Sequence, residues 1–371
     1  SNPDTTVRFL AVLMSYLFFT AVQTSIMIPY FSLSSEMTED YTERARMTSV
    51  RLGFSIFASI VCVAVPGIIV ASFDGNFGYI VMSLTFGAFF MICVMITGLF
   101  AKEGIPAPKK AEPFIIKDFV RPFKIRPFRQ YLWLFICCQM TMAIMSALFF
   151  FYVDFYFAAG ITAAGQENIV GMVGAAIMFS MQIVALPLYM KLIRKTSKTA
   201  VYILGSIIWI ISAPVVLLLP PDSNPVYLYI LAAVMGFGIS GPGLIPHAIF
   251  PDVVDVGDLQ FKARVAGAFS GIANFANKIS QAIGLAVVMG VIGLAGFVEQ
   301  DISEGAAKVV SQPRSAQLAI VILMAFAPLV FMSLGCYVCT RYRLNKVRHA
   351  EVLAAIESGD DAEREAVLAS L

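Results

Sequence analysis

The chain has 371 residues, of which 59% are hydrophobic and only 13% are charged, and its mean hydropathy is +0.82. Soluble domains carry about 25% charged residues. The composition therefore excludes a soluble domain and indicates an integral membrane protein. The net charge of +2 gives no sign of nucleic-acid binding, and we expect none. The six cysteines lie in or beside apolar stretches without zinc-type spacing, so we interpret them as buried thiols and expect no metal site.

Nine apolar stretches are long enough to cross a bilayer as helices. They are 9–33, 52–72, 78–100, 131–158, 168–190, 200–219, 226–249, 265–297 and 316–340. A helix needs about 20 apolar residues to cross the hydrocarbon core. None of the stretches shows the ten-residue alternation of a barrel strand. The sequence therefore predicts an all-α integral membrane protein.

The basic residues predict its orientation. Alternate loops and the C-terminal tail hold 22 of the 26 Lys and Arg residues. The positive-inside rule makes this side cytoplasmic, with the C-terminus inside and Ser1 outside the cell (inner) membrane. With an odd number of spans and a cytoplasmic C-terminus, Ser1 lies outside. An N-terminus outside the cell is unusual for a chain without a signal peptide. We therefore expect an odd number of helices ahead of Ser1, and three would complete a six-plus-six arrangement.

The longest basic loop divides the nine stretches into three and six. We predict a partial N-terminal bundle of three helices at 1–100, a cytoplasmic inter-bundle loop at 101–130, a six-helix C-terminal bundle at 131–343 and a cytoplasmic tail at 344–371. In the tail, one helix has an apolar face that consists of Val347, Val352, Leu353 and Ile356. Gly359 is expected to end that helix, and Asp360 or Asp361 to cap a second one.

Residues 247–284 carry the main charged motif. We predict an acidic loop that begins at a proline and contains Pro251, Asp252, Asp255 and Asp258. Lys262 and Arg264 follow, and then an apolar helix with a single charge, Lys278. At 1.5 Å per residue, Lys278 lies about 21 Å beyond Arg264 and so deep in the membrane. A charge there needs a partner or a wet cavity, so Lys278 is either a structural residue or part of a polar pathway.

Small residues on the same helix predict close packing. Gly267 and Gly271 form a GxxxG step, and Ala276, Ser280 and Gly284 follow it. The seventh stretch is also rich in helix breakers, from Gly236 and Gly238 to Pro242 and Pro246. Two interpretations of that stretch remain open, a hinge or a close-packed crossing.

Polar residues form a stripe on the first stretch. Its members are Tyr16, Thr20, Gln23, Met27, Tyr30 and Ser34, with Thr24 at the border. Their spacing of three and four residues places them on one helix face. The stripe either makes hydrogen bonds between helices or forms the wall of a substrate cavity.

Arg51 opens the second stretch. It either extends to the membrane interface or points into a cavity, where its planar fork of donors would suit hydroxyls or a carboxylate. The chain has no phosphate-binding loop and no evident nucleophile–base pair, so we do not expect an enzyme.

Two long motifs carry a family resemblance. IPYFSLSSEMTEDYTERARMTSVR (28–51) and FPDVVDVGDLQFKARVAGAFSGIANFANK (250–278) resemble segments of the glycoside–pentoside–hexuronide:cation symporters, the melibiose-permease-like branch of the major facilitator superfamily. The ending RYRLNKVRHAEVLAAI is similar to the family's tail. The resemblance covers nearly the whole chain as helices four to twelve of a major facilitator fold. It therefore also implies three helices ahead of Ser1.

The resemblance implies roles for individual residues. Arg51 and Phe31 match sugar-contacting positions, Thr24 matches a cation-site threonine, and Lys278 matches the intramembrane lysine. Tyr30 and Gln23 join the expected substrate site through the polar stripe. The acidic motif implies a cytoplasmic gate of Asp252, Asp255 and Arg264. Melibiose permeases have an aspartate where this chain has Met27, and their other coupling carboxylates lie on helices one and two. Sodium, protons or no coupling ion therefore remain open.

We expect a monomeric secondary transporter that carries a sugar or glycoside with a cation by alternating access, and needs no cofactor. One alternative is a carrier of another amphipathic solute on the same fold. Another is a truncated membrane fragment or interaction subunit that does not transport.

Overall fold

The computed structural model describes residues 3–37, 41–73, 77–101, 120–160, 169–262, 266–298 and 312–370. Within these ranges the chain is helical and contains no strand. Nine of the described helical segments are long and apolar enough to cross a membrane, and they coincide with the nine predicted stretches. The prediction of an all-α membrane protein is confirmed.

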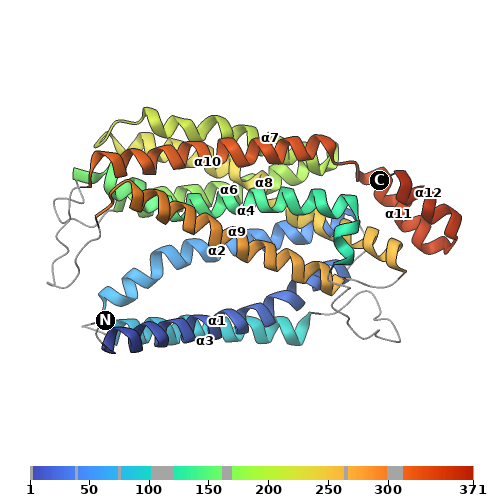
Figure 1. Ribbon diagram of the computed structural model, residues 1–371, viewed down its shortest axis with the longest axis horizontal. Helices are drawn as coiled ribbons and strands as arrows, with labels where there is room; N and C mark the ends of the chain where they lie inside the picture. Colours follow the sequence, from blue (N-terminus) through green and yellow to red (C-terminus); the bar gives the residue numbers. More distant parts are fainter. Residues whose placement is uncertain are drawn as a thin grey trace.

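Figure 1 shows the helices in their order along the chain. The first three are α1 (Pro3–Glu36), α2 (Tyr41–Ala71) and α3 (Phe77–Phe100). A short 3-10 helix (Arg121–Lys124) leads into α4 (Arg126–Tyr152), which continues as a π-helical turn (Val153–Phe157). Next come α6 (Ile169–Lys195) and α7 (Lys198–Ser212), which continues as a 3-10 turn (Ala213–Leu218). The last spans are α8 (Pro225–Phe261), α9 (Ala266–Leu294) and α10 (Arg314–Arg341).

Two predicted boundaries differ from the structure. α4 begins at Arg126, inside the predicted loop 101–130, and Pro127 occupies its first turn, where a missing amide donor costs nothing. The acidic stretch from Pro251 was expected to be a loop, but α8 continues through it to Phe261. Pro251 is tolerated because neighbouring helices can satisfy the backbone group that it leaves free. Asp252 and Asp255 therefore lie on a rigid helix.

Burial is uneven along the chain. The buried apolar core belongs almost entirely to the helices from α4 onward. Large apolar side chains on α1 and α3 are exposed, such as Phe18 and Leu99. α2 packs on α6 and α1 packs on α9, while α3 packs on α2. Exposed apolar surface of this kind suits contact with lipid. The division into two bundles at the inter-bundle loop stays a prediction.

The cysteines are not all buried as predicted. Cys137, Cys138 and Cys339 are buried, but Cys62 and Cys93 are exposed on α2 and α3. The prediction was wrong for these two because both lipid-facing and protein-facing surfaces of a membrane helix are apolar. Apolar neighbours in the sequence therefore do not show whether a cysteine faces the protein or the lipid.

The glycines of α8 lie at close helix crossings. A Cβ atom on Gly236 would collide with the carbonyl oxygen of Met178 on α6, and one on Gly241 would lie 3.0 Å from the carbonyl oxygen of Val201 on α7. Of the two interpretations of this stretch, these contacts support the close-packed crossing and not the hinge. On α9, a Cβ on Gly284 would lie 2.9 Å from that of Ala143, whereas one on Gly267 would meet no described residue within 4 Å. The predicted GxxxG packing is therefore wrong at Gly267.

Replacing Gly236 with alanine is expected to destabilise the protein by about 1–3 kcal/mol, because the added methyl group overpacks the α6–α8 crossing. Thermal unfolding of the purified protein in detergent measures the change. Gly290→Ala on α9 is the matched control, since a Cβ there meets nothing within 4 Å. Equal midpoints for the two variants would show that the crossing tolerates a wider separation.

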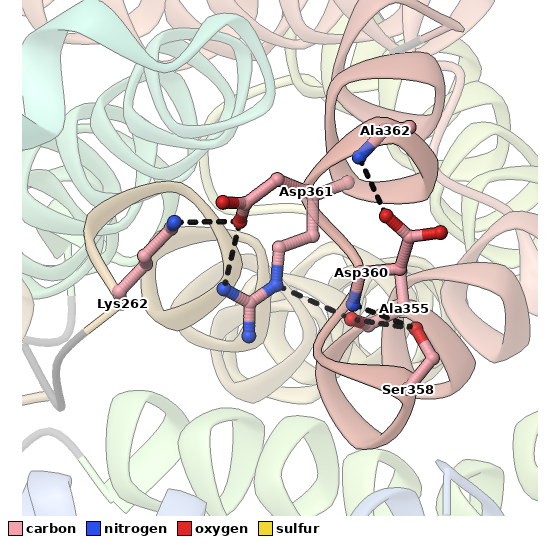
Figure 2. Close-up of polar contacts among 7 residues, drawn as sticks. Lys262, Ala355, Ser358, Asp360, Asp361 and Ala362 are labelled. Carbon is pink, nitrogen blue, oxygen red and sulfur yellow. Dashed lines mark hydrogen bonds and ion pairs between the residues drawn. The ribbon is translucent and has the colours of Figure 1, made fainter.

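The tail forms α11 (Lys346–Ser358) and α12 (Asp361–Ser370). Gly359 ends α11 at a φ of 70°, and the Asp360 carboxylate accepts a hydrogen bond from the Ala362 amide at 2.9 Å, as predicted. Val352 is fully buried against α8, but Val347 is 67% exposed and does not belong to the apolar face. Lys262 at the end of α8 donates to Asp361 at 2.6 Å, and Arg364 lies beside that carboxylate (Figure 2). The tail is thus packed against the end of α8.

Candidate substrate and coupling site

Arg51 lines a pocket between α2, α4, α8 and α9. The other lining residues are Tyr131, Phe135, His247, Phe250, Ala273, Asn274 and Asn277. The space between atoms amounts to about 340 Å³, part of it open to solvent, but only about 10 Å³ can take the centre of a water molecule. A solute larger than water therefore needs the helices to move apart before it can enter.

Aromatic rings form much of the pocket wall. Tyr131 stacks on Phe135 with ring centroids 5.7 Å apart and lies 5.6 Å from Phe250. Phe135 meets His247 edge-on at 5.8 Å. The Arg51 guanidinium lies 5.7 Å from the centre of the Tyr30 ring on α1. Ring faces and hydrogen-bonding groups thus occur together, as in sites that bind a solute with one apolar face and polar edges.

A polar seam adjoins the pocket at Asn277. The Asn277 side-chain oxygen accepts hydrogen bonds from Gln139 at 2.6 Å and from Gln281 at 3.0 Å. The next residue, Lys278, is half-buried and donates to the Gln23 side chain of α1 at 2.7 Å. Among the described residues, Lys278 has an amide oxygen and no carboxylate as its partner. The charge is therefore satisfied by one neutral group between α1 and α9.

The acidic residues of α8 form a second, buried cluster. Lys198 donates to Asp252 at 2.6 Å and to the Ala248 carbonyl oxygen at 2.8 Å. His349 of α11 lies 2.8 Å from an Asp255 oxygen and 3.9 Å from Asp252. Lys198 and Asp252 are only 3% and 2% exposed. This cluster joins α7, α8 and the tail. No group of three His, Cys, Asp or Glu residues in the described ranges could hold a metal ion.

The structure brings together some of the predicted site residues. Arg51 meets Tyr30, and Gln23 meets Lys278, so the expected substrate and coupling residues lie on neighbouring helices. Thr24 is half-buried beside Gln23 on α1. The side chain of Phe31 and the whole of Arg264 lie outside the described residues. Asp252 and Asp255 contact Lys198 and His349, which sequence reasoning did not link to them.

Sequence reasoning also missed most of the pocket wall. The missed residues are Tyr131, Phe135, His247, Phe250, Asn274 and Asn277. One signal was available, because Asn274, Asn277, Lys278 and Gln281 recur at steps of three and four residues and so share one face of α9. The aromatic residues gave no such signal, because aromatic side chains are common on every face of these helices.

Comparison with known proteins assigns the chain to a family of transporters. Residues 1–346 match the family described as MFS/sugar transport protein. The uncharacterized symporter sll1374 of Synechocystis is 22% identical over 95% of this chain and 77% of its own length. The glucuronide carrier protein homolog of Escherichia coli is 23% identical over 89% of this chain and 69% of its length. The sodium-dependent lysophosphatidylcholine symporter 1-A of Danio rerio is 21% identical over 91% of this chain and 67% of its own length.

These matches confirm the resemblance to the glycoside–pentoside–hexuronide:cation symporters and the major facilitator fold. The family and these relatives are transporters and not enzymes. Together with the nine apolar helices of the described chain, they make the protein a multi-pass membrane protein. The chain therefore belongs to the MFS/sugar transport protein family.

Proposed function

We propose that the protein is a secondary active transporter that carries a glycoside or related sugar together with a cation by alternating access. The observation that carries the proposal is the pocket at Arg51, where a guanidinium, two asparagines and stacked aromatic rings converge. A sugar ring has one apolar face, which packs on aromatic rings, and hydroxyl edges, which hydrogen-bond to Arg and Asn. The pocket offers both kinds of contact within one site.

Alternating access gives a reason for the narrow pocket. In this class of transporter, two bundles rock about a central site, which opens to one side at a time. Here the pocket walls come from α2 on one side and from α4, α8 and α9 on the other. Movement of α2 relative to the later helices would widen it. We propose the division at 101–130 as the boundary between the moving bundles, with that loop and the tail on the cytoplasmic side of the inner membrane.

We assign the cation coupling to Lys278, Gln23 and Thr24. Among the described residues, the hydrogen-bond partner of Lys278 is the neutral side chain of Gln23, so no carboxylate neutralises its charge. This charge lies beside the proposed substrate pocket. Release of the Gln23–Lys278 bond would let α1 and α9 separate. The relative from Danio rerio is named as sodium-dependent, which supports coupling to a cation.

Uptake into vesicles tests the proposal. The protein, expressed with any segment that precedes Ser1 in its gene, is reconstituted and given an imposed sodium or proton gradient and a panel of labelled glycosides. We expect accumulation of at least one glycoside that collapses when the gradient is dissipated. If active protein accumulates none of them under either gradient, the sugar proposal is wrong.

A second candidate is a carrier of an amphipathic lipid-like solute. The lysophosphatidylcholine symporters among the relatives favour it, as do the aromatic pocket walls. The polar residues of the pocket favour the sugar instead, since a lipid chain needs an apolar path along the helices. Labelled lysophosphatidylcholine in the same vesicles distinguishes the two, because only one class of solute should accumulate.

Replacing Arg51 with lysine should weaken glycoside binding about tenfold or more, because the ammonium keeps the charge but loses the planar fork and its second hydrogen bond. Equilibrium binding of the transported glycoside to purified protein measures the change. Arg46→Lys is the control, since Arg46 is exposed on the same helix. Unchanged affinity in Arg51→Lys would leave Arg51 as an interfacial anchor.

A further inference from the structure

A second pocket lies at the end of the helices, away from Arg51. It is formed where α6 ends, α7 begins and α11 begins, with the start of the α2 span at its side. Its space between atoms is about 740 Å³, of which about 240 Å³ can take the centre of a water molecule. It is thus much roomier than the pocket at Arg51 and can hold a polar headgroup without any helix movement.

Two cationic side chains line the pocket. Arg194 at the end of α6 and Lys346 at the start of α11 both line it, and neither forms a hydrogen bond or ion pair with any described residue. The polar side chains of Thr196, Ser197 and Asn345 lie beside them. The segments 191–198 and 341–349 contain no acidic residue. Glu43 on α2 has an interaction of its own within the protein. Among the described residues, the two cations of the pocket therefore have no acidic partner.

Apolar residues also line the pocket. They are Ala45, Met190, Ile193 and Val347, and Val347 is 67% exposed. Ala45 begins the candidate membrane span of α2, and Lys195 ends that of α6, so the pocket lies where these apolar spans end. Cations and apolar side chains together at the end of the spans match a phospholipid, whose phosphate lies at the boundary and whose chains enter the hydrocarbon.

We propose that this pocket binds the phosphate headgroup of an anionic phospholipid from the surrounding bilayer. Two helices, α7 and α11, begin at the pocket, and their positive dipole ends add to the attraction. Ser197 and Asn345 already cap these helices, so the binding charge comes from Arg194 and Lys346. Lys198 contributes nothing here because it is buried against Asp252.

Site occupancy would stabilise one arrangement of the helices. The pocket touches α2, the α6–α7 turn and α11, which come from three of the four predicted parts of the chain: the first bundle, the second bundle and the tail. A bound lipid would therefore tie the tail and α2 to the end of α6. The site is separate from the proposed sugar pocket, so its test does not depend on the transported solute.

Native mass spectrometry of the detergent-solubilised protein tests the proposal. Phosphatidylglycerol and phosphatidylcholine are titrated separately, and the double variant Arg194→Gln/Lys346→Gln is compared with the parent. We expect the variant to bind phosphatidylglycerol roughly thirty-fold more weakly, at about 1 kcal/mol for each lost charge, with phosphatidylcholine binding unchanged. Both side chains are exposed, so the fold should be retained.

The control is Lys195→Gln/Arg343→Gln, which removes two exposed positive charges from the same end of the molecule but outside the pocket. It should leave phosphatidylglycerol affinity within about twofold of the parent. Equal losses in both double variants would show general surface attraction and overturn the site. Full displacement of the lipid by millimolar inorganic phosphate would also overturn it, since the ligand would then be a free phosphate compound.

Discussion

Replacing Lys278 with leucine is expected to abolish gradient-driven uptake while leaving the protein folded in the membrane. Lys278 donates to Gln23 at 2.7 Å and is half-buried between α9 and α1, next to the pocket residue Asn277. Leucine fits an apolar helix and removes the cost of placing a charge there, so insertion should not suffer. Among the described residues of the seam, the variant removes the charged side chain, which a bound cation would repel.

Uptake and binding must be measured together to interpret Lys278. We expect accumulation to fall to the level of vesicles without protein, while downhill exchange of the glycoside is retained in part. Arg314→Leu is the control, because it removes one exposed positive charge from the beginning of α10. Gradient-driven accumulation at the parental rate in Lys278→Leu would reduce Lys278 to a packing residue held by Gln23.

Replacing Lys198 with methionine is expected to destabilise the protein by about 3–5 kcal/mol, because it leaves the Asp252 carboxylate buried without its cation. The two groups are 2.6 Å apart and are only 3% and 2% exposed. The Ala248 carbonyl oxygen loses a donor as well. The thermal unfolding midpoint in detergent should fall on the order of 10 °C.

Two further variants make the Lys198 result specific. Lys198→Met/Asp252→Leu should recover most of the lost stability, since removal of both charges leaves no uncompensated group. Lys262→Met breaks an ion pair of the same 2.6 Å length, but that pair is 58% and 70% exposed, so the midpoint should hardly change. If Lys198→Met and Lys262→Met behaved alike, burial would not determine the strength of these pairs.

Local sequence signals predicted the helices well. The nine spans of the described chain could be predicted because the bilayer thickness sets the length of an apolar stretch, and that length can be read locally in the sequence. The tail helices were found from Gly359 and Asp360, which act on the backbone within a few residues. The glycines of α8 indicated a special crossing, but the hinge remained an equal alternative until Met178 and Val201 were seen against them.

The site needed the tertiary structure. Lys278 and Gln23 are 255 residues apart in the chain, and Lys198 and Asp252 are 54 apart, so no local pattern pairs them. In a soluble helix, the polar face marks the surface and so shows which side is buried. In a membrane helix, both the lipid-facing and the protein-facing sides are apolar, and this signal disappears. The sequence by itself therefore determined the spans, the family motifs and the residues that carry charge. Only packing decided which of those residues meet, and that Tyr131, Phe135 and His247 complete the pocket at Arg51.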